Sequence, residues 1–100
     1  MTNGARPPRE VADFCGEYGD EGILLADGFD EAFLGVGTQY HHPPVAVYDR
    51  AGCLEILATD FVSDGVSEDE AYEQAVEFFE FNVQGAWVGE QTPIFIDRYT

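Results

Sequence analysis

The sequence predicts a small α+β domain. Its 100 residues are enough for one domain, and 45% of them are hydrophobic, which suffices for a packed core. Strand-like and helix-like spacings of apolar residues occupy separate parts of the chain. The stretch Glu77–Ile96 contains the only tryptophan and the change from helical to strand spacing. We therefore expect a small, mainly antiparallel sheet covered by one main helix, with a short N-terminal helix.

The N-terminal elements follow from local spacing. We expect residues 1–8 to form a flexible tail and residues 9–100 to form a single α+β domain. Apolar residues at spacings of three and four predict a helix over Arg9–Tyr18. Ile23–Leu25 is interpreted as a short strand, and Asp27-Gly28 as a turn.

The middle of the chain predicts a run of strands. Phe29–Ala32 fits a helical turn or a loop before a strand over Phe33–Tyr40. The connection His41–Pro44 leads to a second strand over Val45–Tyr48. Cys53–Ala58 fits either a helix or a strand. The aspartate and glycine that precede it suit a type I turn, so we favour a hairpin between Val45–Tyr48 and Cys53–Ala58.

The main helix has the clearest local signal. Ser67 and Glu70 form a capping box, in which the serine accepts a hydrogen bond from the Glu70 backbone and the glutamate bonds back. The helix is predicted to run to about Phe81. Its predicted buried face comprises Tyr72, Ala75, Val76, Phe79 and Val83. The opposite face carries an acidic stripe of Glu70, Glu73, Glu77 and Glu80.

The C-terminal part is predicted to return to the sheet. A tight turn over Asn82–Gly85 follows the helix, with Gly85 in a left-handed conformation. Ala86–Val88 and Pro93–Ile96 are predicted strands, joined by a bulge or a hairpin loop. Trp87 is predicted to be a core anchor whose N–H finds a partner.

Charge is the most unusual property of the sequence. Twenty carboxylates face four arginines and no lysine, so the formal net charge is −16. This balance excludes direct binding to nucleic acid or to anionic lipid, because both require basic side chains. Three explanations are open: a halophilic-like adaptation to salt, a merely solvated acidic surface, or an acidic face that imitates nucleic acid or binds a basic partner.

The expected localisation rests on two kinds of segment that the sequence lacks. No apolar run approaches the roughly 20 residues that a membrane span needs. The N-terminus lacks the apolar region of a signal peptide. We therefore expect a cytoplasmic protein without membrane contact.

The residues that most often carry catalysis or metals give no pattern here. His41 and His42 are adjacent, so on an extended chain their side chains point to opposite faces and do not share an ion. Cys15 and Cys53 are expected to be reduced, buried and inert thiols. We predict no catalytic residue, metal or cofactor.

A polar loop offers an alternative site. Asn82, Glu90, Thr92 and His41 are polar and lie near predicted turns. Two glycines on one face of the first strand, at positions 35 and 37, leave a groove that this loop could border. On this alternative reading the protein is a small enzyme with a site at the Gly35/Gly37 groove and the Glu90 loop.

Three segments resemble a family of small uncharacterised proteins encoded by bacteriophages and prokaryotes. They begin at Asp27 (DGFDEAFLG), at Val45 (VAVYD) and at Phe81 (FNVQGAWVGEQTPIF). The resemblance covers about residues 27–96 and implies no particular activity. A phage setting would place the protein in the host cytoplasm and would favour a small inhibitor of a host protein.

The sequence therefore leads to one main functional hypothesis. We expect a non-enzymatic protein that binds a basic protein partner through its acidic helix face, as an inhibitor or a nucleic-acid mimic. The alternatives are the small enzyme described above and a salt-adapted domain whose acidity serves solvation only. The oligomeric state stays open.

Overall fold

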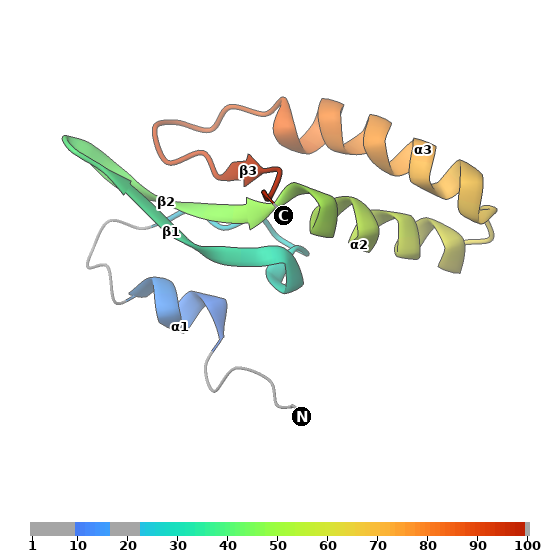
Figure 1. Cartoon of the computed structure of the whole chain (residues 1–100), viewed down its shortest axis with the longest axis horizontal. Helices are drawn as coiled ribbons and strands as arrows, with labels where there is room; N and C mark the ends of the chain where they lie inside the picture. The colour runs from blue at the N-terminus through green and yellow to red at the C-terminus, as the bar shows by residue number, and fades with distance from the viewer. Residues whose placement is uncertain (1–9, 17–22, 100) are drawn as a thin grey trace.

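The computed structural model describes residues 10–16 and 23–99 (Figure 1). The predicted tail and the predicted end of the first helix lie outside these residues. Helices and one small sheet form an α+β domain, as predicted. The elements are α1 (Val11–Gly16), η2 (Asp30–Ala32), β1 (Phe33–Gln39), β2 (His42–Asp49), α2 (Arg50–Ser63), α3 (Glu68–Phe79), the π turn η3 (Glu80–Gln84) and β3 (Ile94–Ile96).

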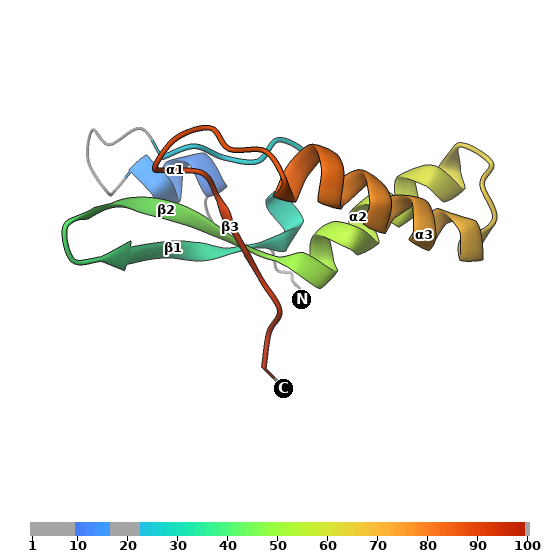
Figure 2. The same ribbon diagram turned by 90° about the horizontal axis from the view of Figure 1, so that it is seen from above.

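The sheet is mixed rather than antiparallel throughout. Its strand order is β1-β2-β3, and β1 pairs with β2 in the antiparallel direction. β3 is parallel to β2, with Val47 opposite Ile94 and Tyr48 opposite Phe95. The sheet is thus mainly antiparallel, as predicted, and its one parallel pair arises because two helices connect β3 to β2. Figures 1 and 2 show that α2 and α3 run out and back beside each other beyond one end of the sheet.

The β1–β2 hairpin is tighter than the sequence suggested. Its turn contains only Tyr40 and His41, and Gln39 pairs with His42. His41, the second residue of the turn, takes a positive φ of 62°, which is the sign that this position has in a type II turn. β2 therefore includes Pro43–Pro44, which were expected to precede it. Both prolines fall at a break in the β1–β2 register, where a missing N–H costs least.

The segment Cys53–Ala58 is helical, so the predicted hairpin with Val45–Tyr48 was wrong. It forms part of α2, in which Cys53 and Leu54 are buried. Gly52 explains the difference. A Cβ atom at this position would lie 3.0 Å from the Cβ atom of Ala32. The glycine therefore serves the close approach of α2 to η2, rather than ending a turn.

Helix α3 begins where the sequence predicts. The Glu70 backbone N–H donates to Ser67 Oγ at 3.4 Å, so the serine half of the capping box is confirmed. The buried side of α3 is formed by Ala71, Ala75 and Phe79. Tyr72 was expected on this side but is 54% exposed, because the buried side is centred on Ala75 and Tyr72 lies at its edge.

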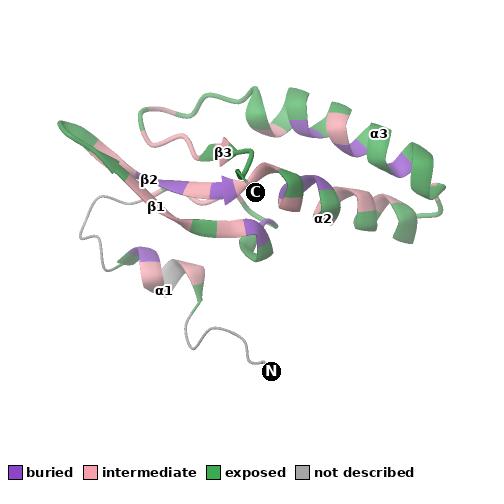
Figure 3. Ribbon diagram, viewed as in Figure 1, coloured by how far each residue is buried: buried purple, intermediate pink, exposed green. Residues whose placement is uncertain are grey.

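The core lies where the sheet meets the near ends of the two helices. Buried positions gather on β2, at the start of α2 and along the inner side of α3 (Figure 3). Phe79 is fully buried and makes edge-on ring contacts with Phe29 and Phe95. Tyr48 is also fully buried, and its hydroxyl accepts a hydrogen bond of 2.8 Å from the Ala26 backbone. This bond ties the Leu25–Ala26 region to the sheet.

Two further strand predictions were wrong. Ile23–Leu25 and Ala86–Val88 are irregular. Trp87 is 75% exposed instead of anchoring the core. Phe95 packs against the core instead, and its ring contacts both Tyr48 and Phe79. The predicted strand Pro93–Ile96 is confirmed as β3, one residue shorter.

The turn after α3 is a π turn, and Gly85 is not left-handed. Its φ is −79°, so the predicted conformation was wrong. The glycine is nevertheless required by space. A Cβ atom at this position would lie 2.8 Å from the carbonyl oxygen of Glu80, five residues earlier.

Gly85→Ala is therefore expected to lower the free energy of unfolding by about 1–3 kcal/mol, because the added methyl group forces the π turn to shift. Urea denaturation followed by circular dichroism measures the loss. Gly16→Ala is the matched control, since nothing lies within 4 Å of its added methyl group. Equal stability of Gly85→Ala and the parent would contradict the proposed steric requirement.

Candidate functional site

The four glutamates of the predicted stripe lie on the outer side of α3 and the π turn. Glu70, Glu73, Glu77 and Glu80 are all exposed. At 100° per residue they lie opposite the buried positions Ala71, Ala75 and Phe79. Figure 3 shows this outer side of α3 as exposed over most of its length. The structure thus brings the four carboxylates together on one surface.

Only one of the four glutamates has a cationic partner within the described residues. Arg50 Nη2 lies 3.4 Å from Glu80 Oε2, and Arg50 Nη1 lies 3.7 Å from Asp97. The same guanidinium lies over the ring of Phe79, 6.0 Å from its centroid. In the part of the chain that the structure covers, no ion pair reaches Glu70, Glu73 or Glu77.

Two exposed aromatic side chains border the glutamates. Phe78 is 42% exposed and Phe81 is 77% exposed. Phe78 packs edge-on against Phe61 of α2, with 6.3 Å between the ring centroids. We use the name acidic–aromatic surface for the set Glu70, Glu73, Glu77, Glu80, Phe78 and Phe81. In the sequence, Phe81 already departs from the helical apolar pattern of the residues before it.

The π turn accounts for the position of Phe81. A π turn contains more residues than an α turn, so it changes the direction in which the following side chains leave the helix. Asn82, in the same turn, donates from its side chain to the Phe78 carbonyl at 3.3 Å. This bond helps to satisfy a carbonyl at the end of α3.

The predicted polar-loop residues divide between two cavities. Glu90 and Thr92 line a cavity of about 400 Å³ together with Gly37 of β1 and His42 of β2. Asn82 and Thr92 line a more apolar cavity of about 360 Å³, whose other walls include Phe29 and Phe95. The structure thus brings Thr92 near both Glu90 and Asn82.

The remaining members of the polar-loop prediction lie elsewhere. His41 is at the tip of the β1–β2 hairpin, where its ring lies 4.0 Å from that of Tyr40. Its neighbour His42 lines the cavity instead, as does Gly37 but not Gly35. Trp87 lines the same cavity, and sequence reasoning missed it because a lone tryptophan usually belongs to the core.

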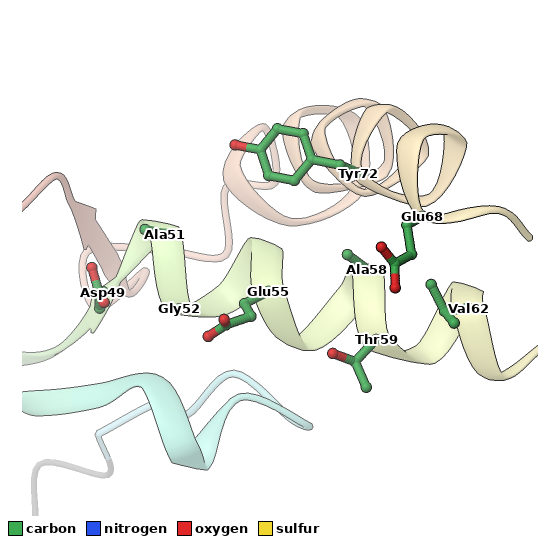
Figure 4. Close-up of a pocket in the computed structure, with 9 residues that line it drawn as sticks. All are labelled: Asp49, Ala51, Gly52, Glu55, Ala58, Thr59, Val62, Glu68 and Tyr72. Atoms are coloured by element: carbon green, nitrogen blue, oxygen red, sulfur yellow. The ribbon is translucent and has the colours of Figure 1, made fainter.

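A third cavity lies between α2 and α3 and has a volume of about 580 Å³ (Figure 4). Its floor on α2 includes small residues such as Gly52 and Ala58. In Figure 4, Glu68 reaches from α3 toward α2, and the ring of Tyr72 extends above Glu55. Sequence reasoning missed this groove because Cys53–Ala58 was interpreted as a strand.

The two thiols are unsuited to nucleophilic chemistry. Cys15 and Cys53 are both free and buried. Burial raises the pKa of Cys53 to about 11, with the nearby Asp49 carboxylate acting in the same direction. Burial also raises the pKa of Cys15. Both thiols are therefore protonated near neutral pH, and the protonated form is a poor nucleophile.

The described part of the chain contains neither a cluster of potential metal ligands nor a helix that could cross a membrane. Within residues 10–16 and 23–99, no group of three or more histidine, cysteine, aspartate or glutamate side chains is arranged to hold a metal ion. Among the helices in those ranges, none has the length and apolar character needed to cross a membrane.

Comparison of the chain with protein-family models, with curated proteins and with solved structures gave no match.

Proposed function

We propose that this chain is a non-enzymatic binding protein that engages a basic protein partner through the acidic–aromatic surface. The observation that carries the proposal is the combination of two features on one surface. Glu70, Glu73 and Glu77 have no cationic partner among the described residues, and Phe78 and Phe81 stand exposed beside them. Interfaces commonly combine aromatic anchors with surrounding polar groups.

The stability of α3 does not account for the glutamates. Neighbouring like charges at spacings of three and four cost roughly 0.2–0.5 kcal/mol each in an isolated helix. Glu70 lies in the first turn, where the helix dipole stabilises a negative charge. Glu77 and Glu80 lie near the opposite end of the helix, where the dipole is unfavourable. Binding of a cationic partner would account for the glutamates, which the stability of α3 does not explain.

Salt adaptation explains the carboxylates but not the aromatic residues. Solvation of carboxylates does not require Phe78 and Phe81 to be exposed together beside the glutamates, and a shared apolar patch is typical of an interaction surface. A basic partner with an apolar residue at its centre uses both features. The cations contact the glutamates, and the apolar residue packs on Phe78 and Phe81.

The resemblance to phage-encoded proteins suggests what such binding would achieve. A small acidic protein that covers the basic surface of a host protein would act as an inhibitor. If that surface normally holds nucleic acid, the acidic–aromatic surface would act as a nucleic-acid mimic. The site of action in this proposal is the host cytoplasm.

The test uses a synthetic amphipathic helix of leucine and lysine as the partner. The triple variant Glu73→Gln, Glu77→Gln and Glu80→Gln is expected to weaken its binding about tenfold or more, because charge is lost while shape and helix propensity are kept. Phe81→Ala is expected to weaken it to a similar degree through the lost anchor. Isothermal titration gives the affinities, and amide chemical shifts should change along α3.

A control variant separates location from total charge. The control carries three other substitutions at exposed positions outside the acidic–aromatic surface: Glu31→Gln, Asp60→Asn and Asp64→Asn. It loses the same number of negative charges as the first triple variant. This control should bind the peptide within about threefold of the parent. If both triple variants weaken binding equally, or if Phe81→Ala binds like the parent, the peptide responds to net charge alone and the proposal is wrong.

A further inference from the structure

The loop that carries Trp87 is held in place by a set of hydrogen bonds. Thr92 Oγ1 accepts from the Val88 backbone at 2.9 Å and donates to the Gly89 carbonyl at 2.6 Å. The Thr92 backbone N–H also donates to the Gly89 carbonyl at 3.1 Å. Gly89 takes a φ of 113°, which favours glycine. The loop therefore has one preferred shape before any ligand arrives.

A further bond attaches this loop to the β1–β2 hairpin. The side chain of Gln91 donates to the Pro44 carbonyl at 3.0 Å, at a point on β2 that β3 does not reach. The cavity of about 400 Å³ lies between the loop and the hairpin. Its floor includes Gly37, where an added Cβ atom would lie 3.2 Å from Val47. A larger residue at position 37 would therefore crowd Val47.

The lining combines one aromatic side chain with hydrogen-bond acceptors. Trp87 lines the cavity, and its side chain is largely exposed to solvent. Glu90 is exposed beside it and has no ion pair with any cation in residues 10–16 or 23–99. Gln39 and Thr38, whose side chains carry acceptor oxygens, also line the cavity. This set suits a flat cation, which can stack on indole and donate to a carboxylate.

The net charge of the chain further restricts the chemical class of the ligand. A net charge of −16 opposes the approach of anions and favours cations. Among biological cations the guanidinium group is planar, presents five donors and is weakly hydrated. An ammonium group is compact and strongly hydrated, so it gains less from stacking on an indole ring.

We propose that the cavity between Trp87, Glu90 and the β1–β2 hairpin is a binding site for a guanidinium group, stacked on Trp87 and paired with Glu90. The group can belong to an arginine of a protein or to a small free compound. The site is separate from the acidic–aromatic surface and does not depend on the function proposed for that surface.

Intrinsic fluorescence tests the site directly, because Trp87 is the only tryptophan. The full chain is titrated with N-acetyl-arginine amide, with its lysine counterpart and with its citrulline counterpart, which keeps the shape of arginine without the charge. The arginine compound is expected to change the fluorescence and to bind about tenfold more tightly than either of the other two. Similar affinities for the arginine and lysine compounds would overturn the proposal.

Two variants locate the bound group. Glu90→Gln is expected to weaken the arginine compound about tenfold, because the charged hydrogen bonds are lost. The triple variant Glu73→Gln, Glu77→Gln and Glu80→Gln should bind it like the parent. The reverse pattern would place the cation on α3 and overturn the proposal. Both variants change exposed side chains, and circular dichroism verifies their folding.

Methylguanidine separates the two sources of the group. Binding of methylguanidine with the same dependence on Glu90 shows that the group alone suffices, as a small free ligand would require. If methylguanidine binds about tenfold more weakly than the arginine compound, with Glu90→Gln still weakening the latter, the site is one for arginine within a polypeptide. Binding of neither compound would overturn the proposal.

Discussion

Phe79→Ala is expected to lower the free energy of unfolding by about 3–5 kcal/mol. Phe79 is fully buried and joins α3 to Phe29 on one side and to Phe95 of β3 on the other. Removing its ring leaves a cavity at the point where helix, loop and sheet meet. Urea denaturation followed by circular dichroism gives the difference.

Phe78→Ala is the matched control, because it removes the same side chain one position earlier in the same helix. Phe78 is partly exposed and contacts Phe61 rather than the sheet. Its loss should cost about 1 kcal/mol, well below that of Phe79. Losses of equal size would mean that the two rings contribute alike, against the packing described above.

Stability should fall as the pH rises from about 9 to about 11. The pKa of Cys53 is raised from 9.0 to about 11 in the folded chain, with burial as the main cause. Between these values the folded chain keeps a proton that the unfolded chain releases, so each increase in pH favours unfolding. The loss from this thiol is on the order of 2 kcal/mol. Burial also raises the pKa of Tyr48, which adds to the loss at higher pH.

Cys53→Ala isolates the thiol contribution. Its free energy of unfolding, measured by urea denaturation at several pH values, should decline less steeply than that of the parent over this range. The slopes are compared rather than the absolute values, because the substitution itself removes buried volume. Identical slopes for variant and parent would show that Cys53 titrates alike in the folded and unfolded chains.

Sequence reasoning worked where the decisive interaction is local. The Ser67 cap, the turn at Asp27-Gly28 and the strand that begins at Phe33 depend on residues a few positions apart, and all three are present. It failed where the local structure depends on a contact with a residue far away in the sequence. Gly52 resembles a turn residue in the sequence, and only the nearby Ala32 reveals it as a point of close packing.

The two candidate sites also differ in how far the sequence predicts them. The placement of the glutamates on one side of α3 follows from helical periodicity and needs no tertiary information. The meeting of Trp87 and Glu90 with Gly37 depends on the loop lying against a hairpin far away in the sequence. No local pattern shows that the single tryptophan stays outside while Phe95 enters the core.

The parallel pairing of β3 with β2 has a consequence for how the chain folds. β1 meets β2 across a two-residue turn, and α2 meets α3 across a short loop, so both contacts close small loops. Val47 also pairs with Ile94, but both helices lie between these two residues in the sequence, so this pairing closes a much larger loop. Loop-closure entropy grows by about 0.6 kcal/mol for each doubling of loop length. We therefore expect β3, whose pairing has the highest contact order, to join the sheet last, once Phe79 and Tyr48 already offer a surface for Phe95.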